Sequence, residues 1–190
     1  MKPLIAAVLI FLLALAGAVE AERIAGVEVP VQGSFAGHEL KLKGAGVREQ
    51  WFMDIYVGGL YLPESMAEAG AREIIESDQP MAIRLMIVSG MITSAKLKEA
   101  TMEGLNKSMD GDIEPIKAQV ERFLAGFDEE IAEGDQFDIV HDPAKGVLVY
   151  KNGVDQGIVA EGDLFKRAVF GIWLSDDPVQ SGLKEGMLGR

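Results

Sequence analysis

Residues 44–63, GAGVREQWFMDIYVGGLYLP, form the stretch that decides the fold. From Val47 to Leu62 the residues alternate in character as a β-strand does, because successive strand residues face opposite sides of a sheet. Pro63 then ends the strand, since proline gives no backbone N–H to a ladder. We expect this long strand to be central in the sheet. Its apolar face is predicted from Trp51, Met53, Ile55, Val57, Gly59 and Tyr61, and its mixed face from Arg48, Gln50, Phe52, Asp54, Tyr56, Gly58 and Leu60.

Shorter strand patterns lie on both sides of this stretch. Asn152-Gly153 is a strong signal for a type I′ turn between two of them. Gly44-Ala45-Gly46 is expected to end the strand that precedes it. The predicted short strands are 26–31, 39–43, 81–88, 136–140, 146–151 and 156–160.

Helical patterns separate and follow these strands. Thr93 or Ser94 is a suitable N-cap, and so is Asp163. The helix from Leu164 to Trp173 is expected to cover the apolar face of the long strand. Strands cluster with strands, which predicts an α+β fold with a large, mostly antiparallel sheet covered by helices on one face. The predicted helices are 65–76, 93–109, 113–131, 163–173 and a short last helix that ends at Leu188.

The N-terminus has the layout of a secretory signal peptide. Lys2 supplies a positive charge, residues 4–15 are apolar, and small residues lead to possible cleavage sites after Ala18 or Ala21. The apolar run is shorter than the roughly 20 residues of a membrane span. We therefore expect a signal peptide at 1–21, a single domain at 22–190, and a periplasmic or otherwise secreted product that is not an integral membrane protein after cleavage. An uncleaved N-terminal anchor is the alternative.

Composition excludes several classes of partner. The net charge is −12, which disfavours nucleic acid and anionic lipid because both require a positive surface. The chain has no cysteine, so neither a disulfide nor a catalytic thiol is expected. A domain of this length can rely on its hydrophobic core in an oxidising compartment.

Common catalytic and metal-binding motifs are missing from the sequence. His38 and His141 are the only histidines, and neither has the spacing of a zinc motif. There is no Gly-x-Ser-x-Gly, no P-loop and no dinucleotide-binding motif. We expect neither a metal nor a cofactor. Asp138, His141 and Asp142 are interpreted as a solvated turn at the end of a strand.

Two blocks of sequence carry a resemblance to a known family. The first is GAGVR at 44–48, followed by Trp51-Phe52 and by IYVGGLYLP at 55–63. The second is AVFGIWLSDDPV at 168–179, with Leu183-Lys184 and Met187-Leu188-Gly189 near the end. Together they resemble the bacterial chalcone isomerase-like family of exported proteins, in order and over nearly all of the predicted domain.

The resemblance implies a large antiparallel sheet, a layer of helices on one face and a ligand cleft between the two. It also implies two functional types. Plant chalcone isomerase closes a chalcone into a flavanone without a cofactor, and the plant fatty-acid-binding relatives hold a carboxylate with an arginine and a tyrosine. The positions that match these two residues are Arg48 and Tyr56. They share a parity, so both side chains can face one cleft, where a guanidinium and a phenol would bind a carboxylate or enolate oxygen.

One part of the plant isomerase pattern is missing from this chain. The enzyme has a tyrosine and a lysine near the start of a helix, whereas residues 93–99 here, TSAKLKE, contain lysines and no tyrosine. Lys96 and Lys98 are therefore interpreted as a solvated helix face. The favoured hypothesis is a non-catalytic domain that binds a small apolar ligand with an anionic or carbonyl oxygen, with Phe52 and Leu60 lining the cleft. A cofactor-independent isomerase and a structural or interaction domain are the alternatives, and the sequence leaves the oligomeric state open.

Overall fold

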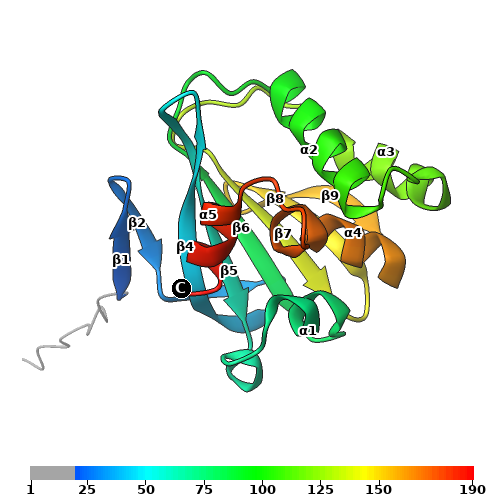
Figure 1. The fold of residues 1–190 in the computed structure, drawn as a ribbon, viewed down its shortest axis with the longest axis horizontal. Coiled ribbons are helices and arrows are strands. Elements are labelled where there is room, and N and C mark those ends of the chain that lie inside the picture. The colour runs from blue at the N-terminus through cyan, green and yellow to red at the C-terminus, as the bar shows by residue number, and fades with distance from the viewer. Residues whose placement is uncertain (1–19) are drawn as a thin grey trace, which may run out of the picture.

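A seven-stranded antiparallel sheet forms the centre of the protein (Figure 1). The computed structural model describes residues 20–190, so the predicted signal peptide lies outside the described residues except for Glu20 and Ala21. The strands follow one another in the sheet in sequence order. They are β3 (Gln32–Phe35), β4 (His38–Gln50), β5 (Met53–Leu62), β6 (Met81–Ile87), β7 (Gln136–Asp142), β8 (Gly146–Lys151) and β9 (Val154–Ala160).

Helices cover one face of this sheet, and a separate hairpin lies beyond its other face (Figure 1). The predicted α+β architecture is therefore confirmed. Within residues 20–190, no helix is long and apolar enough to cross a bilayer. The helices are η1 (Glu64–Met66), α1 (Ala71–Glu76), α2 (Ser94–Ser108), η2 (Glu114–Ile116), α3 (Lys117–Ala125), α4 (Asp163–Leu174) and α5 (Ser181–Met187), and the hairpin consists of β1 (Ala21–Ile24) and β2 (Val27–Pro30).

The prediction of a single long strand from Val47 to Leu62 is wrong, because this segment forms a hairpin. The chain turns at Trp51 and Phe52, whose φ values are 57° and 66°, and β4 then pairs with β5. Both central residues of a type I′ turn need positive φ, which costs roughly 1–2 kcal/mol for each residue other than glycine. Neither tryptophan nor phenylalanine signals such a turn, so the alternating pattern continued through it. The middle strand of the sheet is β6.

A β-bulge in this hairpin sets which side chains face the helices. Gln50 pairs with Met53 at the turn, but further along Arg48 pairs with Tyr56, which leaves Ile55 as an extra residue. Residues directly opposite each other in a pair point to the same side of the sheet. The bulge therefore brings Arg48 and Tyr56 to one face.

The helix α4 does not cover the predicted apolar face. It packs on the side of the sheet that carries Tyr56 and Leu60, whereas Val57 and Tyr61 point away from the main helical core. The opposite face is also buried: Val29 of β2 packs on Val57, and the ring of Phe35 packs at a tilt against that of Tyr61. Two buried faces explain why alternation alone did not identify the helix-facing side.

The glycines at 44 and 46 do not end a strand, since β4 runs continuously from residue 38 to residue 50. They let α5 lie directly on the backbone of β4. A Cβ added at Gly44 would lie 2.4 Å from the Gly186 carbonyl oxygen, and one at Gly46 would lie 2.9 Å from the Leu183 carbonyl oxygen. These distances are shorter than atomic contact allows, so only glycine fits this crossing.

Several local expectations are confirmed. The Thr93 hydroxyl accepts from the backbone N–H of Lys96 and so caps α2. Asn152 and Gly153 form the β8–β9 turn with φ of 51° and 77°.

The bounds of two predicted helices differ in the structure. The helix expected over 113–131 is shorter, because Gly126 ends α3 despite the apolar residues that follow. The cap of α4 is Gly162 rather than Asp163, which is the first helical residue.

Candidate functional site

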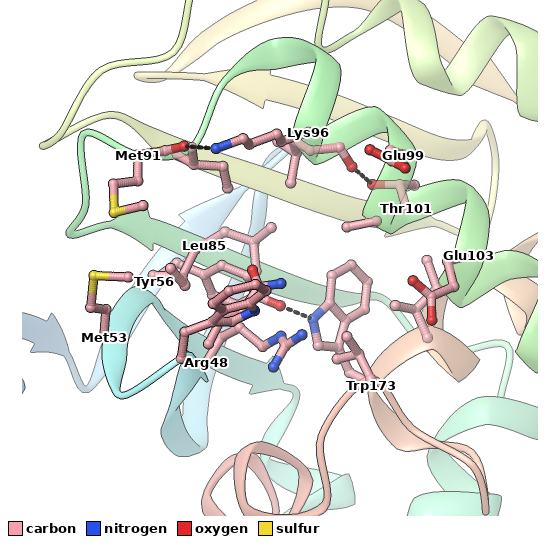
Figure 2. A pocket seen from close by; sticks show the side chains of 18 residues that line it. Arg48, Met53, Tyr56, Leu85, Met91, Lys96, Glu99, Thr101, Glu103 and Trp173 are labelled. Atoms are coloured by element: carbon pink, nitrogen blue, oxygen red, sulfur yellow. Dashed lines mark hydrogen bonds between the residues drawn. The ribbon is translucent and has the colours of Figure 1, made fainter.

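A cavity of about 490 Å³ lies between the sheet and the helical layer (Figure 2). Arg48 of β4 and Tyr56 of β5 both line it, so the two residues that sequence reasoning selected lie in one cavity. Apolar side chains form much of the remaining wall. These include Leu85 of β6, Ile92 of the loop after β6, Leu97 of α2, and Ile172 of α4.

The indole of Trp173 positions the phenol of Tyr56. Trp173 Nε1 donates a hydrogen bond of 3.0 Å to the Tyr56 hydroxyl oxygen, and both side chains are buried (Figure 2). Tryptophan can only donate, so the tyrosine must accept and its own hydroxyl proton remains available. No residue among 20–190 accepts that proton in a hydrogen bond. The Tyr56 hydroxyl can therefore donate to a ligand oxygen in the cavity.

Burial raises the pKa of Tyr56 to about 12. The hydrogen bond from Trp173 and the positive charge of Arg48 both act in the opposite direction, because they favour the phenolate. Desolvation is the larger effect. Tyr56 is consequently a neutral hydrogen-bond donor at neutral pH rather than a base.

A glutamine holds the guanidinium of Arg48 at the edge of the cavity. Arg48 Nη1 donates to Gln180 Oε1 at 3.0 Å and to the Glu49 carbonyl oxygen at 2.6 Å. The same Gln180 oxygen accepts from the backbone N–H of Glu49 at 3.0 Å, which ties the start of α5 to β4. Within the described part of the chain, nothing accepts a hydrogen bond from Arg48 Nε or Nη2. Those donors remain for an anionic or carbonyl oxygen.

The prediction that Phe52 and Leu60 line the cavity is wrong. Phe52 is fully exposed at the turn between β4 and β5 and does not line the cavity, and Leu60 is buried in the core away from it. Phe52 was assigned to the wall because the turn was not recognised. Lys96 is exposed as predicted, although it lies at the cavity wall and donates to the Met91 carbonyl oxygen at 3.0 Å. Lys98 is half-buried and pairs with Asp128.

Sequence reasoning also missed two positioning residues. Trp173 was expected only to pack α4 against the sheet, and Gln180 was not selected at all. Both lie at or just after the block at 168–179 that carries the family resemblance. That block was the only available signal, since neither periodicity nor spacing separates Trp173 from its packed neighbours.

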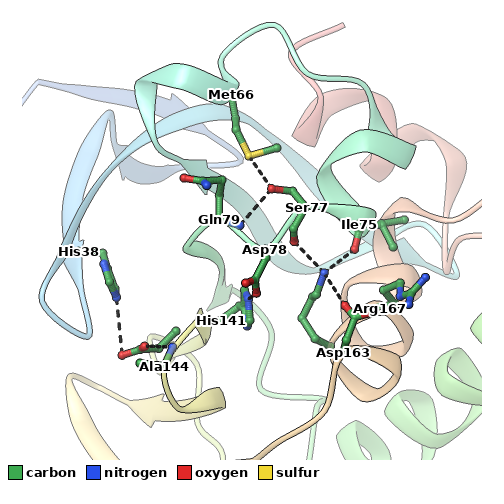
Figure 3. A network of polar contacts seen from close by, with 12 residues as sticks. His38, Met66, Ile75, Ser77, Asp78, Gln79, His141, Ala144, Asp163 and Arg167 are labelled. Carbon is green, nitrogen blue, oxygen red and sulfur yellow. Dashed lines mark hydrogen bonds and ion pairs between the residues drawn. The ribbon is translucent and has the colours of Figure 1, made fainter.

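The residues predicted to form a solvated turn are instead buried in β7. Asp138 forms a bidentate pair with Arg84, with distances of 2.7 Å and 2.9 Å, on the face opposite the helices. Asp142 lies 3.6 Å from His38 Nε2, and His141 Nε2 lies 3.2 Å from Asp78 Oδ1 (Figure 3). Both aspartates and His141 Nε2 therefore have partners, which lets the strand continue to Asp142 without exposing it, whereas His141 Nδ1 is buried without a hydrogen-bond partner.

The network around His141 joins β7 to α1 and α4. Lys166 of α4 is buried, and its Nζ donates to the carbonyl oxygens of Ile75 and Ser77 at 2.7 Å each (Figure 3). Burial lowers the pKa of His141, the charge of Lys166 lowers it further, and Asp78 acts in the opposite direction. Among residues 20–190 no group of three or more metal-ligating side chains occurs.

Comparison with known proteins agrees with this fold. A fatty-acid-binding protein of Arabidopsis thaliana has a similar structure, with a TM-score of 0.69 and 21% sequence identity over 89% of this chain and 96% of that one. At that identity the likeness establishes the fold. No curated protein matches the sequence. The sequence profile of the chalcone isomerase-like family matches residues 21–189, nearly the whole described chain, and the protein therefore belongs to that family.

Proposed function

We propose that this protein binds a small apolar molecule that carries an anionic or carbonyl oxygen, such as a fatty acid. One observation carries the proposal: the free donors of Arg48 and the hydroxyl proton of Tyr56 meet in a cavity that is otherwise largely apolar. Ligand sites commonly combine apolar walls with a few polar groups that fix orientation. The fatty-acid-binding function of the Arabidopsis structure supports this choice of ligand class.

The structure offers little to support the isomerase alternative. Residues 93–99 border the cavity through Lys96, Leu97 and Glu99, and no tyrosine stands there. With a pKa of about 12, Tyr56 does not supply a base at neutral pH. The proposed role, binding and orienting a ligand oxygen, requires no catalytic base.

Calorimetric titration with fatty acids and with flavonoid-like carbonyl compounds tests the proposal. Arg48→Ala removes a charge-assisted contact worth about 1.5–3 kcal/mol, which corresponds to a loss of affinity of roughly tenfold to a hundredfold. Arg72→Ala is the matched control, because it removes the same charge from an exposed helix position outside the cavity. It should bind as the wild type does.

Three outcomes separate the hypotheses. Equal affinity of wild type and Arg48→Ala would refute the assignment of the site. If no compound binds while the protein is folded, a structural or interaction role is favoured. Turnover of a chalcone by the wild type, lost in Arg48→Ala, would favour the isomerase.

We also propose that residues 1–21 contain a cleaved secretory signal and that the mature protein is periplasmic or otherwise secreted. Cleavage after Ala18 is preferred, because the Glu20 carbonyl oxygen accepts from Val31 at 2.9 Å and Ala21 begins β1. Cleavage after Ala21 would remove both contributions to the fold. N-terminal sequencing of protein recovered from the cell envelope is expected to begin at Val19, and recovery of Met1 would contradict the proposal.

A further inference from the structure

Exposed apolar side chains surround the mouth of the cavity. Trp51 is 80% exposed, Phe52 is fully exposed, and Met53 and Met91 are 38% and 50% exposed. We call these four residues the apolar tip. Trp51, Met53 and Met91 also line the cavity, so the exposed apolar surface continues into it (Figure 2).

The two aromatic residues at this tip have positive φ values, a backbone conformation that is unfavourable for them. Four hairpins in the described chain have two-residue turns with positive φ at both positions. Three of them place glycine second, namely Ala25-Gly26, Ala36-Gly37 and Asn152-Gly153, as such turns favour. Only the fourth, Trp51-Phe52, has no glycine and uses two of the bulkiest side chains. Residues held in strained backbone conformations of this kind cluster at functional sites.

We propose that the apolar tip docks the protein onto the surface of a zwitterionic phospholipid bilayer. Tryptophan and phenylalanine favour the interfacial region of bilayers. The charges beside the tip are mixed, with Arg48, Lys96, Glu99 and Glu103 at the cavity and Glu49 and Asp54 on the two strands. They match the phosphate and ammonium groups of a zwitterionic headgroup, whereas the net charge of −12 disfavours an anionic surface.

A bilayer fits this tip better than a protein partner does. A stable protein interface buries about 800 Å² on each partner, which four side chains around a narrow turn do not supply. An interfacial wedge requires only that a few side chains enter the headgroup region. An apolar ligand would then pass between the bilayer and the cavity without crossing water. That transfer rests on the proposed function, but docking does not, because it requires no ligand.

Flotation with ligand-free phosphatidylcholine vesicles tests the docking. The chain from Val19 onward is used, since it contains every described element without the apolar N-terminal segment, and its cooperative unfolding is confirmed first. The double variant Trp51→Asn with Phe52→Gly installs preferred turn residues. It is expected to lose at least tenfold in vesicle partitioning while unfolding at a higher temperature than the wild type. Val154→Ser is the control, because it removes an exposed apolar side chain from a hairpin away from the cavity.

Fluorescence gives a second readout. The chain has two tryptophans, and Trp173 is buried, so exposed Trp51 should shift to shorter wavelength on vesicles and be quenched by brominated lipid. The proposal is overturned if the folded wild type does not partition, or if the double variant partitions equally well. It is also overturned if the tip instead mediates a dimer, seen as a mass in solution that the double variant halves. Calorimetric binding of soluble ligands by the double variant shows separately whether the cavity functions.

Discussion

At the scale of single residues, the polar end of the cavity depends on one hydroxyl group with a fixed direction. The Trp173 N–H occupies an acceptor position of the Tyr56 oxygen, so the tyrosine proton is left to face the cavity. Tyr56 thus contributes a neutral donor beside the charged donors of Arg48. A ligand oxygen held by both would be oriented as well as attracted.

Tyr56→Phe should weaken ligand binding by about 0.5–1.5 kcal/mol, or roughly twofold to tenfold, because it removes this donor and keeps the ring. Since the pKa of Tyr56 is about 12, its contribution should persist well above pH 10, where an exposed tyrosine begins to lose its proton. Calorimetric titration measures the loss, with Tyr150→Phe as the control outside the cavity. An unchanged affinity would show that Tyr56 only packs.

His141 should make stability depend on pH. Its pKa in the folded protein is below the usual 6.5, so the unfolded chain binds the proton more readily. The free energy of unfolding should therefore fall as pH decreases through 6.5, and it should level off below the folded-state pKa. Urea unfolding between pH 7.5 and 5.5 measures the slope, which should be smaller in His141→Gln than in the wild type. Equal slopes for the wild type and His141→Gln would exclude His141 as the cause.

The pair Arg48 and Tyr56 shows how far the sequence could predict the site. Their separation of eight residues placed them on one face of a single straight strand, and the structure does place them on one face. The cause differs, because the bulge at Ile55 makes them cross-strand partners. Continued without the bulge, the pairing that begins at Gln50 and Met53 would set Arg48 opposite Ile55. Bulges leave no clear trace in an alternating pattern, so this placement could not be derived from periodicity.

At the scale of elements, the crossing of α5 over β4 supports the site. Gly44 and Gly46 admit the helix, and Gln180 at its start holds Arg48. In the sequence these glycines were interpreted as the end of a strand, because a glycine required by a close contact has the same appearance as one required by a turn.

Gly46→Ala should destabilise the protein by about 1–3 kcal/mol, since its Cβ would overlap backbone atoms of α5 that cannot move independently. Urea unfolding measures the change. Gly70→Ala is the matched control, because its φ is negative and a Cβ there meets nothing within 4 Å. A Gly46→Ala protein as stable as the control would mean that α5 is free to shift away from β4.

At the scale of the whole molecule, the predicted architecture is confirmed because it depended on the order of elements. Clustered strands with Asn152-Gly153 between two of them indicated antiparallel pairing, whatever the exact boundaries. The burial of both sheet faces was not predicted. It depends on the β1–β2 hairpin and on the ring of Phe35 above Tyr61, which are long-range contacts.

A bound ligand should stabilise the entire fold, because the cavity is built from the sheet, α2 and α4 together. At a concentration 100 times the Kd, the gain is about 2.7 kcal/mol. For a domain of this size it raises the Tm by about 5–10 °C. Differential scanning calorimetry with a fatty acid measures the shift, which should be smaller for Arg48→Ala at the same ligand concentration. A shift of equal size in both proteins would point to binding elsewhere.

The contacts that complete the cavity also fix when it can exist during synthesis. Gln180 meets Arg48 across 132 positions of sequence, and Trp173 meets Tyr56 across 117. A ribosome has therefore made most of the chain before either contact can form. A nascent chain that contains the whole β4–β5 hairpin still lacks the indole and the carboxamide that orient its two donors. Under the proposed function, ligand capture is thus an event of the finished protein, and a prematurely terminated chain would have no complete site with which to compete for ligand.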